Sequence, residues 1–162
     1  MIEERRTCDC RRRQSGLAMV EFALSVPVLL LLMFGAFEFG HFLIQYSTLN
    51  DAVRNASRYA AGKASGDTTG NLLTGAAWTS LVTQTTNLAV FGNIMGTPPA
   101  VLPSLNATYI TVSPDLPNKY ITVAVVDYRY QPLFGAVIPT FMGGSGISTA
   151  FKLNISVTMR AL

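Results

Sequence analysis

The sequence predicts an α+β fold, in which a long N-terminal membrane-spanning helix continues into an amphipathic helix and packs on a small, mostly antiparallel three-stranded sheet. Three observations lead to this prediction. An apolar run lies near the N-terminus, a helical periodicity continues after it, and the last third of the chain holds three stretches with strand-like alternation. The composition agrees, since 13% of the 162 residues are charged, whereas a typical soluble domain has about 25%.

The apolar run at residues 17–37 is the predicted membrane span. Glu21 is its only charge, and a helix of this length covers roughly 31 Å, which is about the thickness of a hydrocarbon core. Arginines precede the run and the next one is Arg54, which predicts a cytoplasmic N-terminus and an outer location for the rest of the chain. Pro27 removes one backbone donor, so we expect a kink near Ala23.

A cleaved secretory signal is the main alternative for this basic start and apolar run. Glu21 and Pro27 interrupt the run, however, and no small-residue cleavage motif follows it. Gly62 is the predicted stop of a helix that runs on for about 45 residues. The reason is that apolar residues recur at three- and four-residue steps beyond the run: Phe39, Phe42, Leu43, Tyr46, Leu49, Val53, Ala56, Tyr59 and Ala60.

In the region after the long helix, the sequence predicts one short helix and three strands. Gly, Ser and Thr dominate its first part, which indicates a loop. Residues 77–91 have the spacing of an amphipathic helix. Strands are predicted at 107–113, 120–132 and 151–161, and the alternation is clearest in the last. Residues 133–148 are expected to form a long connection that packs on the sheet or on a neighbour.

These boundaries divide the chain into four segments. They are a basic cytoplasmic leader at 1–16, a transmembrane helix at 17–44, an amphipathic extension at 45–62 and a small outer α+β domain at 63–162. Five of the twelve Lys and Arg residues and three of the nine acids lie in the leader, so the rest of the chain has seven cations against six acids and contributes little to the net charge of +3. Because the remainder is almost neutral, the sequence predicts no basic face that would bind nucleic acid.

Few residues in the chain could support catalysis or metal binding. His41 is the only histidine, and we expect it on the helix surface or at an interface. Cys8 and Cys10 lack the further ligands that a zinc site needs. Glu38 lies at the outer edge of the apolar run, where solvent or a nearby partner would satisfy it. The sequence therefore predicts no enzyme, no catalytic or metal-binding residue and no cofactor.

The boundary at Gly16 is where the chain resembles a known family. The stretch "GLAMVEFALSVPVLLLLMFGAFEFG", followed by "LNDAVRNASRYAAG", resembles type IV prepilins and specifically the TadE-like pseudopilin family of tight-adherence pilus systems. The resemblance implies that an inner-membrane prepilin peptidase cuts between Gly16 and Leu17. The new Leu17 ammonium would then pair with Glu21, of the same subunit or of a neighbour, and the pair would set the axial register between subunits.

The resemblance also implies a role, a set of partners and a location. The role is that of a minor pilin or pseudopilin required for assembly of a tight-adherence, type IVb-like surface pilus used in adhesion. The partners are the prepilin peptidase, other pseudopilins, the major pilin and the inner-membrane assembly platform. The location is the bacterial inner membrane, with a cytoplasmic N-terminus and a periplasmic C-terminal domain, or the extracellular pilus after assembly. The alternative is an uncleaved single-pass membrane protein whose outer domain binds a ligand or an envelope protein partner.

Overall fold

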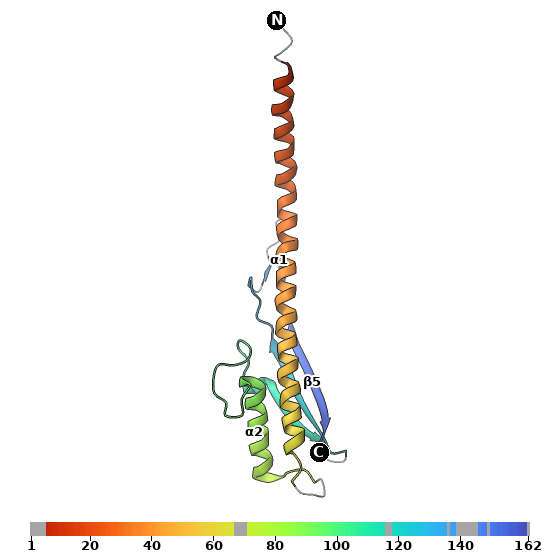
Figure 1. Ribbon diagram of the computed structural model, residues 1–162, viewed down its shortest axis with the longest axis vertical. Helices are drawn as coiled ribbons and strands as arrows, with labels where there is room; N and C mark the ends of the chain where they lie inside the picture. The colour runs from red at the N-terminus through yellow and green to blue at the C-terminus, as the bar shows by residue number, and fades with distance from the viewer. Residues whose placement is uncertain are drawn as a thin grey trace.

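The computed structural model describes the backbone of residues 6–66, 71–115, 118–135, 137–138, 146–148 and 150–161. Side chains are described within these ranges from Gly16 onward, Ile138 and Ile147 excepted. Figure 1 shows a long helix whose C-terminal half carries the later elements, which we call the head. In chain order the elements are α1 (Arg6–Lys63), α2 (Gly75–Phe91), η1 (Ala107–Tyr109), β1 (Ile110–Asp115), β2 (Tyr120–Arg129), β3 (Val137–Ile138), β4 (Ile147–Ser148) and β5 (Lys152–Arg160).

Helix α1 contains 58 residues and starts earlier than expected. It begins at Arg6 instead of Leu17 and continues through Gly16 without interruption. No proline occurs in this basic stretch, and one interior glycine costs only about 1 kcal/mol relative to alanine. At the other end the helix stops at Lys63, one residue past the predicted stop at Gly62. The long helix is confirmed, but its N-terminal boundary was placed too late.

Strands β1, β2 and β5 form the predicted three-stranded antiparallel sheet, with β2 at its centre. Two strand ends differ from the prediction by three residues each, and the others by two residues or fewer. Residues 107–109 form η1, because the Asn106 side chain accepts a hydrogen bond from the N–H of Thr108 and favours a turn. At its far end β2 stops at Arg129, and residues 130–132 turn toward α1. The α+β fold class is therefore confirmed, with shorter strands.

A bulge interrupts the pairing of β2 with β5 between Val125 and Tyr128. Asp127 adopts φ +59° there, a left-handed conformation that Asp tolerates better than most residues. Its N–H donates to Oδ1 of Asn154 at 2.6 Å, and its carboxylate pairs with Lys152 at 3.0 Å. A bulge of this kind increases the local twist, so it re-aims the end of β2.

The connection between β2 and β5 is less irregular than the sequence suggested. Val137–Ile138 pairs antiparallel with Ile147–Ser148, so that β3 and β4 form a second, two-stranded sheet. Its β-branched residues favour strands, but two residues are too few to produce an alternation that a sequence pattern can detect. Residues 139–145, with most of the glycine-rich "GGSG", lie outside the described residues.

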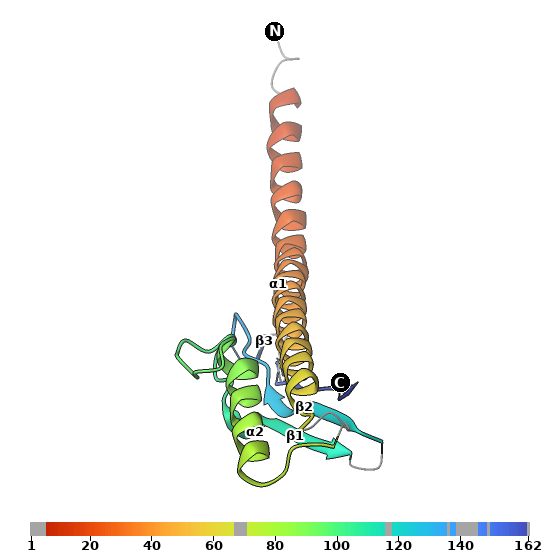
Figure 2. The same ribbon diagram turned by 60° about the horizontal axis from the view of Figure 1, so that its bottom comes forward.

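The hydrophobic core lies between the two helices and one face of the three-stranded sheet (Figure 2). Helix α2 confirms the short helix predicted at 77–91 and begins two residues before it. The opposite face of the sheet is polar, and Thr122 and Thr158 share a hydrogen bond of 2.8 Å there. The α1 side chains in the core are at helical spacing and fully buried: Leu49, Val53, Ala56 and Ala60. They meet Leu81, Ala89, Val90, Ile121, Val123, Val125, Tyr128, Leu153 and Ile155.

Candidate functional site

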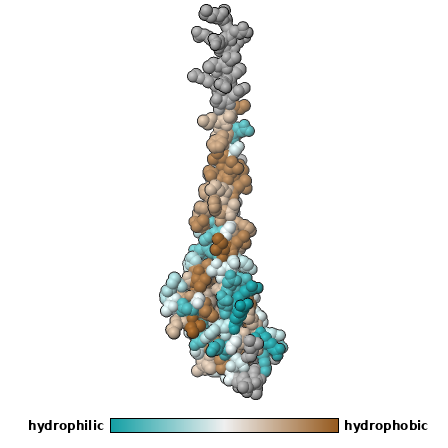
Figure 3. Space-filling view, in the orientation of Figure 1, coloured by the Kyte–Doolittle hydropathy of each residue, from teal (hydrophilic) through white to brown (hydrophobic). Residues whose placement is uncertain are grey.

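Residues 16–37 of α1, which we call the stalk, expose most of their apolar side chains (Figure 3). Leu17 is 72% exposed and Leu24 is 73% exposed. Among the residues that the structure describes, α1 is the one helix long and apolar enough to cross a membrane. An apolar surface of this length suits lipid better than water. The stalk therefore supports a single-pass membrane protein.

The residues that the sequence assigned to cleavage, assembly and the helix kink all lie on the stalk. Leu17 and Glu21 are four residues apart in a continuous helix, so their side chains project from the same face. Glu21 is exposed, and within the described part of the chain no side chain or backbone donor lies against its carboxylate. A Cβ on Gly16 would meet nothing within 4 Å. Pro27 lies inside the helix, which continues past it.

A second glutamate of α1, Glu38, forms the most connected polar site that the structure describes. It is 6% exposed. Its Oε1 accepts a hydrogen bond from the Tyr130 hydroxyl at 2.6 Å, and both carboxylate oxygens lie 3.2 Å from the N–H of Leu133. The N–H of Phe134 also donates to Oε2, at 3.4 Å. The partner that sequence analysis expected for Glu38 is thus the chain's own segment after β2.

Tyr130 is affected by the same contact. Burial of the phenol, followed by its hydrogen bond to Glu38 and the repulsion between the two negative forms, raises the pKa of Tyr130 well above 10.0. The neutral phenol is the form that can donate to the carboxylate. The phenol therefore stays protonated, and able to donate to Glu38, to a higher pH than an exposed tyrosine.

Gln45 holds the adjoining residue of the same segment. Its amide is 2% exposed and bonds both backbone groups of Gln131: Nε2 donates to the carbonyl at 2.8 Å, and Oε1 accepts from the N–H at 3.4 Å. The same Nε2 lies 2.8 Å from Nε2 of His41. The histidine is thus part of the contact between α1 and the head, as predicted for an interface residue.

Aromatic side chains extend this contact along α1. Phe42 packs edge-on against Tyr130, with ring centroids 5.5 Å apart, and against Phe151 at 6.2 Å. Further toward the N-terminus, Phe34 meets Phe134 edge-on at 5.1 Å. The segment after β2 therefore reaches back along the helix to the outer end of the stalk.

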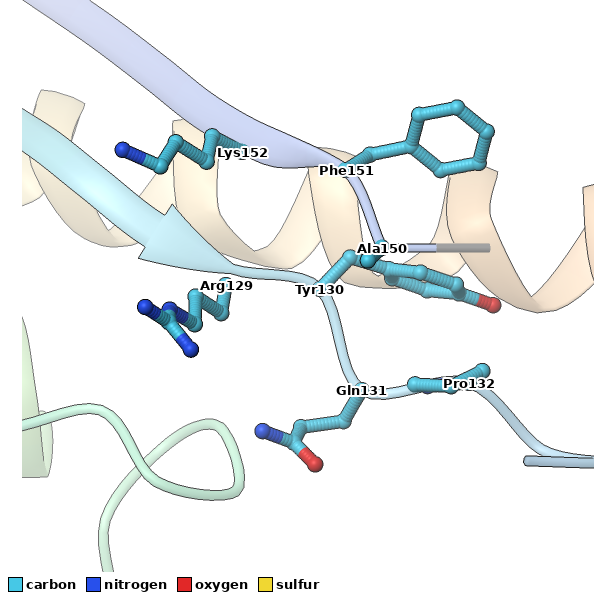
Figure 4. Close-up of a pocket in the computed structure, with 7 residues that line it drawn as sticks. All are labelled: Arg129, Tyr130, Gln131, Pro132, Ala150, Phe151 and Lys152. Atoms are coloured by element: carbon cyan, nitrogen blue, oxygen red, sulfur yellow. The ribbon is translucent and has the colours of Figure 1, made fainter. Parts of the chain in front are cut away.

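A shallow pocket of about 300 Å³ lies at the same end of the head (Figure 4). Arg129 and Lys152 from neighbouring strands contribute its charged side chains, and Tyr130 and Phe151 are its aromatic residues. Lys152 is already paired with Asp127. In the described part of the chain no group of three or more His, Cys, Asp or Glu could hold a metal ion. The pocket has no acid and base placed for catalysis among its lining residues.

Sequence reasoning found the stalk and missed the role of Glu38 and Gln45. A signal was present, because Glu38, His41, Phe42 and Gln45 follow the spacing of one helix face. Polar residues on one face of an otherwise apolar stretch indicate a buried partner. What the pattern lacked was the partner, which lies more than 85 residues further along the chain.

Fold and site together define a class: a membrane-anchored protein with one apolar helix and a small α+β head. Residues 16–58 match the family described as TadE-like protein, which confirms the resemblance found in the sequence. The match covers the stalk and part of the helix under the head, and it begins at Gly16. The match supports a pseudopilin-type role associated with the tight-adherence pilus. No curated protein and no solved structure matches the chain.

Proposed function

We propose that this protein is a minor pilin or pseudopilin required for assembly of a tight-adherence, type IVb-like surface pilus. The observation that carries the proposal is the TadE-like segment, which begins at Gly16 and continues through a stalk of exposed apolar residues. In this proposal residues 17–37 cross the inner membrane, the leader at 1–16 is cytoplasmic and the head is periplasmic. The arginine-rich leader supports that orientation.

Cleavage by a prepilin peptidase between Gly16 and Leu17 is the first step of the proposed function. A peptidase needs an extended backbone, whereas this bond lies inside α1, so the local turn must unwind before cleavage. Gly16 lowers the free energy needed for that, since glycine destabilises a helix by about 1 kcal/mol relative to alanine. No neighbouring atom requires a glycine at this position, and the same is true of Gly35 and Gly40.

Glu21 is proposed to pair with the new α-ammonium of Leu17. One turn of helix separates them, so the pair can form within a subunit, and the exposed carboxylate can also reach the ammonium of a neighbouring subunit. An unpaired charge in the bilayer is unfavourable, by about 2.5–3.5 kcal/mol at the centre on insertion scales. A pair formed between subunits would lower that free energy and set their axial register.

The partners in this proposal are the prepilin peptidase, sibling pseudopilins, the major pilin and the inner-membrane assembly platform. Helix-to-helix contacts along the stalk would join the subunits, since its apolar side chains are uncovered. The expected kink at Pro27 would shape that contact, because a proline removes one backbone hydrogen bond and needs neighbouring groups to replace it.

Intact-mass measurement with and without the peptidase tests the proposal. The chain from peptidase-positive cells is expected to start at Leu17, and the Gly16→Val variant to keep residues 1–16. Gly35→Val is the matched control, because a Cβ there also meets nothing within 4 Å, and it should be cleaved normally. A mature wild-type chain that starts before Leu17 would refute processing at this bond.

An uncleaved single-pass protein is the second candidate, and the continuous helix across Gly16 and Leu17 favours it. In that case the pocket beside Arg129 and Lys152 would face a ligand or an envelope protein partner. The same mass measurement separates the two candidates, because this one retains the leader in every strain.

A further inference from the structure

The contact between Phe34 and Phe134 places part of the head at the depth of the stalk. Phe34 lies about 26 Å along the helix axis from Leu17 at 1.5 Å per residue, and a hydrocarbon core is about 30 Å thick. If the span begins near Leu17, Phe34 is still inside the apolar layer, near its outer surface. Because the two rings pack edge-on at 5.1 Å, Phe134 lies at the same depth.

We infer that residues 132–134 and Val137, the first residue of β3, dip into the outer surface of the lipid bilayer; we call this segment the loop. This inference rests on the proposed function, since it requires the stalk to span a membrane. The loop suits lipid by composition: Leu133 is 56% exposed, Phe134 is 46% exposed and Val137 is 52% exposed. An uncovered apolar group of this size on a small head marks a contact surface, and the adjoining span makes the bilayer its occupant.

Irregular backbone is unfavourable in a bilayer, because no water is present to bond its N–H groups. Side chains of α1 accept hydrogen bonds from the N–H groups of this loop. Glu38 accepts from the N–H groups of Leu133 and Phe134, Gln45 accepts from that of Gln131, and Pro132 has none. The contact also stabilises Glu38, because a carboxylate near the end of the span needs hydrogen-bond donors and the loop provides them.

The residues behind the loop suit the headgroup layer. Arg129 and Lys152 lie at the ends of β2 and β5 that point toward the stalk (Figure 4), with the exposed ring of Phe151 beside them. Basic and aromatic side chains next to an apolar segment are typical of a membrane–water interface, where phosphate groups accept from the cations. Because Lys152 also pairs with Asp127, the head changes from apolar to charged in the direction away from the span, with two cations and one acid.

Tryptophan scanning in lipid vesicles tests this inference with the full chain. Trp78 is the only tryptophan, so the Trp78→Phe variant provides a background for single reporters. The reporters are Leu133→Trp on the loop, Leu29→Trp on the stalk and Tyr120→Trp at the opposite end of β2, about 30 Å from Arg129 by strand geometry. Each is reconstituted in vesicles whose phospholipids carry bromine on the acyl chains.

Bromine is expected to quench the Leu29→Trp and Leu133→Trp reporters severalfold more than Tyr120→Trp. If Leu29→Trp is quenched while Leu133→Trp resembles Tyr120→Trp, the loop is outside the bilayer and the inference is wrong, although the span stands. If Leu29→Trp is not quenched, the span itself is wrong. A blue-shifted Leu133→Trp emission without quenching would assign the loop to a protein contact and would also overturn the inference.

A second measurement covers the case in which the Trp78→Phe background does not fold. Nitroxide labels are placed at Leu133→Cys and Tyr120→Cys in a chain with Cys8→Ser and Cys10→Ser. In phosphatidylglycerol-containing vesicles, the loop label is expected to be more accessible to oxygen than to a water-soluble nickel complex, and the Tyr120→Cys label the reverse. Equal accessibility at both sites would contradict lipid contact.

Discussion

Glu21 and Glu38 lie on the same helix and have opposite surroundings. Glu21 is exposed on the stalk, and no described group of the chain contacts its carboxylate. Glu38 is 6% exposed and accepts hydrogen bonds from Tyr130, Leu133 and Phe134. A carboxylate in apolar surroundings needs compensation, and among the described residues the segment after β2 provides it for Glu38, whereas none provides it for Glu21. Glu38 therefore contributes to the stability of the fold, whereas Glu21 is the carboxylate that we propose to contact other chains.

The largest expected effect is on Glu21. The Glu21→Ala variant should be processed normally and keep a stable head, but pili on the cell surface should fall to background, because the Leu17 ammonium loses its partner in the bilayer. Electron microscopy of surface pili measures this. Ser25→Ala, one turn further along the stalk, is the control and should assemble. Normal numbers of pili on the Glu21→Ala strain would show that Glu21 does not set the axial register between subunits.

A substitution at Glu38 should instead lower the stability of the head. Removing the Glu38 side chain leaves the N–H groups of Leu133 and Phe134 without their acceptor, and the Tyr130 hydroxyl keeps the more distant Glu38 carbonyl at 3.3 Å. We therefore expect Glu38→Ala to lower the free energy of unfolding of the head by about 3 kcal/mol. Chemical denaturation in detergent, followed by Trp78 fluorescence, measures it.

Glu21→Ala is the matched control for that measurement and should change stability by less than about 0.5 kcal/mol, as expected for a surface position. Equal destabilisation by the two variants would mean that the two glutamates do not differ in the way the contacts indicate.

Removing a single donor should have a smaller effect. Tyr130→Phe keeps the ring that packs on Phe42 and deletes only the hydroxyl that donates to Glu38, so we expect a loss of about 1–2 kcal/mol. Tyr120→Phe, at a side chain 40% exposed, should be neutral in the same denaturation experiment. If Tyr130→Phe leaves the free energy of unfolding unchanged, the backbone N–H donors alone compensate the Glu38 carboxylate.

The smallest effect is a loss of stability in alkaline solution. Burial and the bond to Glu38 raise the pKa of Tyr130, and burial followed by the nearby Tyr109 raises that of Tyr128, from 10.0. Above pH 10 the unfolded chain therefore binds fewer protons than the folded chain, so the free energy of unfolding is unaffected below pH 10 and falls as the pH rises beyond it.

Absorbance of tyrosinate during a pH titration checks this. Two of the six tyrosines should ionise late in the folded protein, and Tyr130→Phe should remove one of those two. An unchanged late fraction in that variant would show that the Glu38 contact does not hold the phenolic proton.

The sequence by itself determined the long helix, α2, the three-stranded antiparallel sheet and the TadE-like segment. Each of these leaves a local record: a run of apolar residues, a period of three to four, or a period of two, produced by burial of one face. The positions of Gly16, Leu17, Glu21 and Pro27 along the stalk could be stated for the same reason. Their separations are set by the helix, and no distant contact changes them.

Only the tertiary structure decided where the head meets the helix. The bonds from Glu38 and Gln45 cross 86 to 96 residues and end on backbone groups of an irregular segment. Backbone groups are identical at every position, so no sequence pattern indicates which one a side chain will meet. The β3–β4 pair and the start of α1 at Arg6 were missed for a related reason: short or continuing elements lack a period of their own, and their boundaries depend on the structure around them.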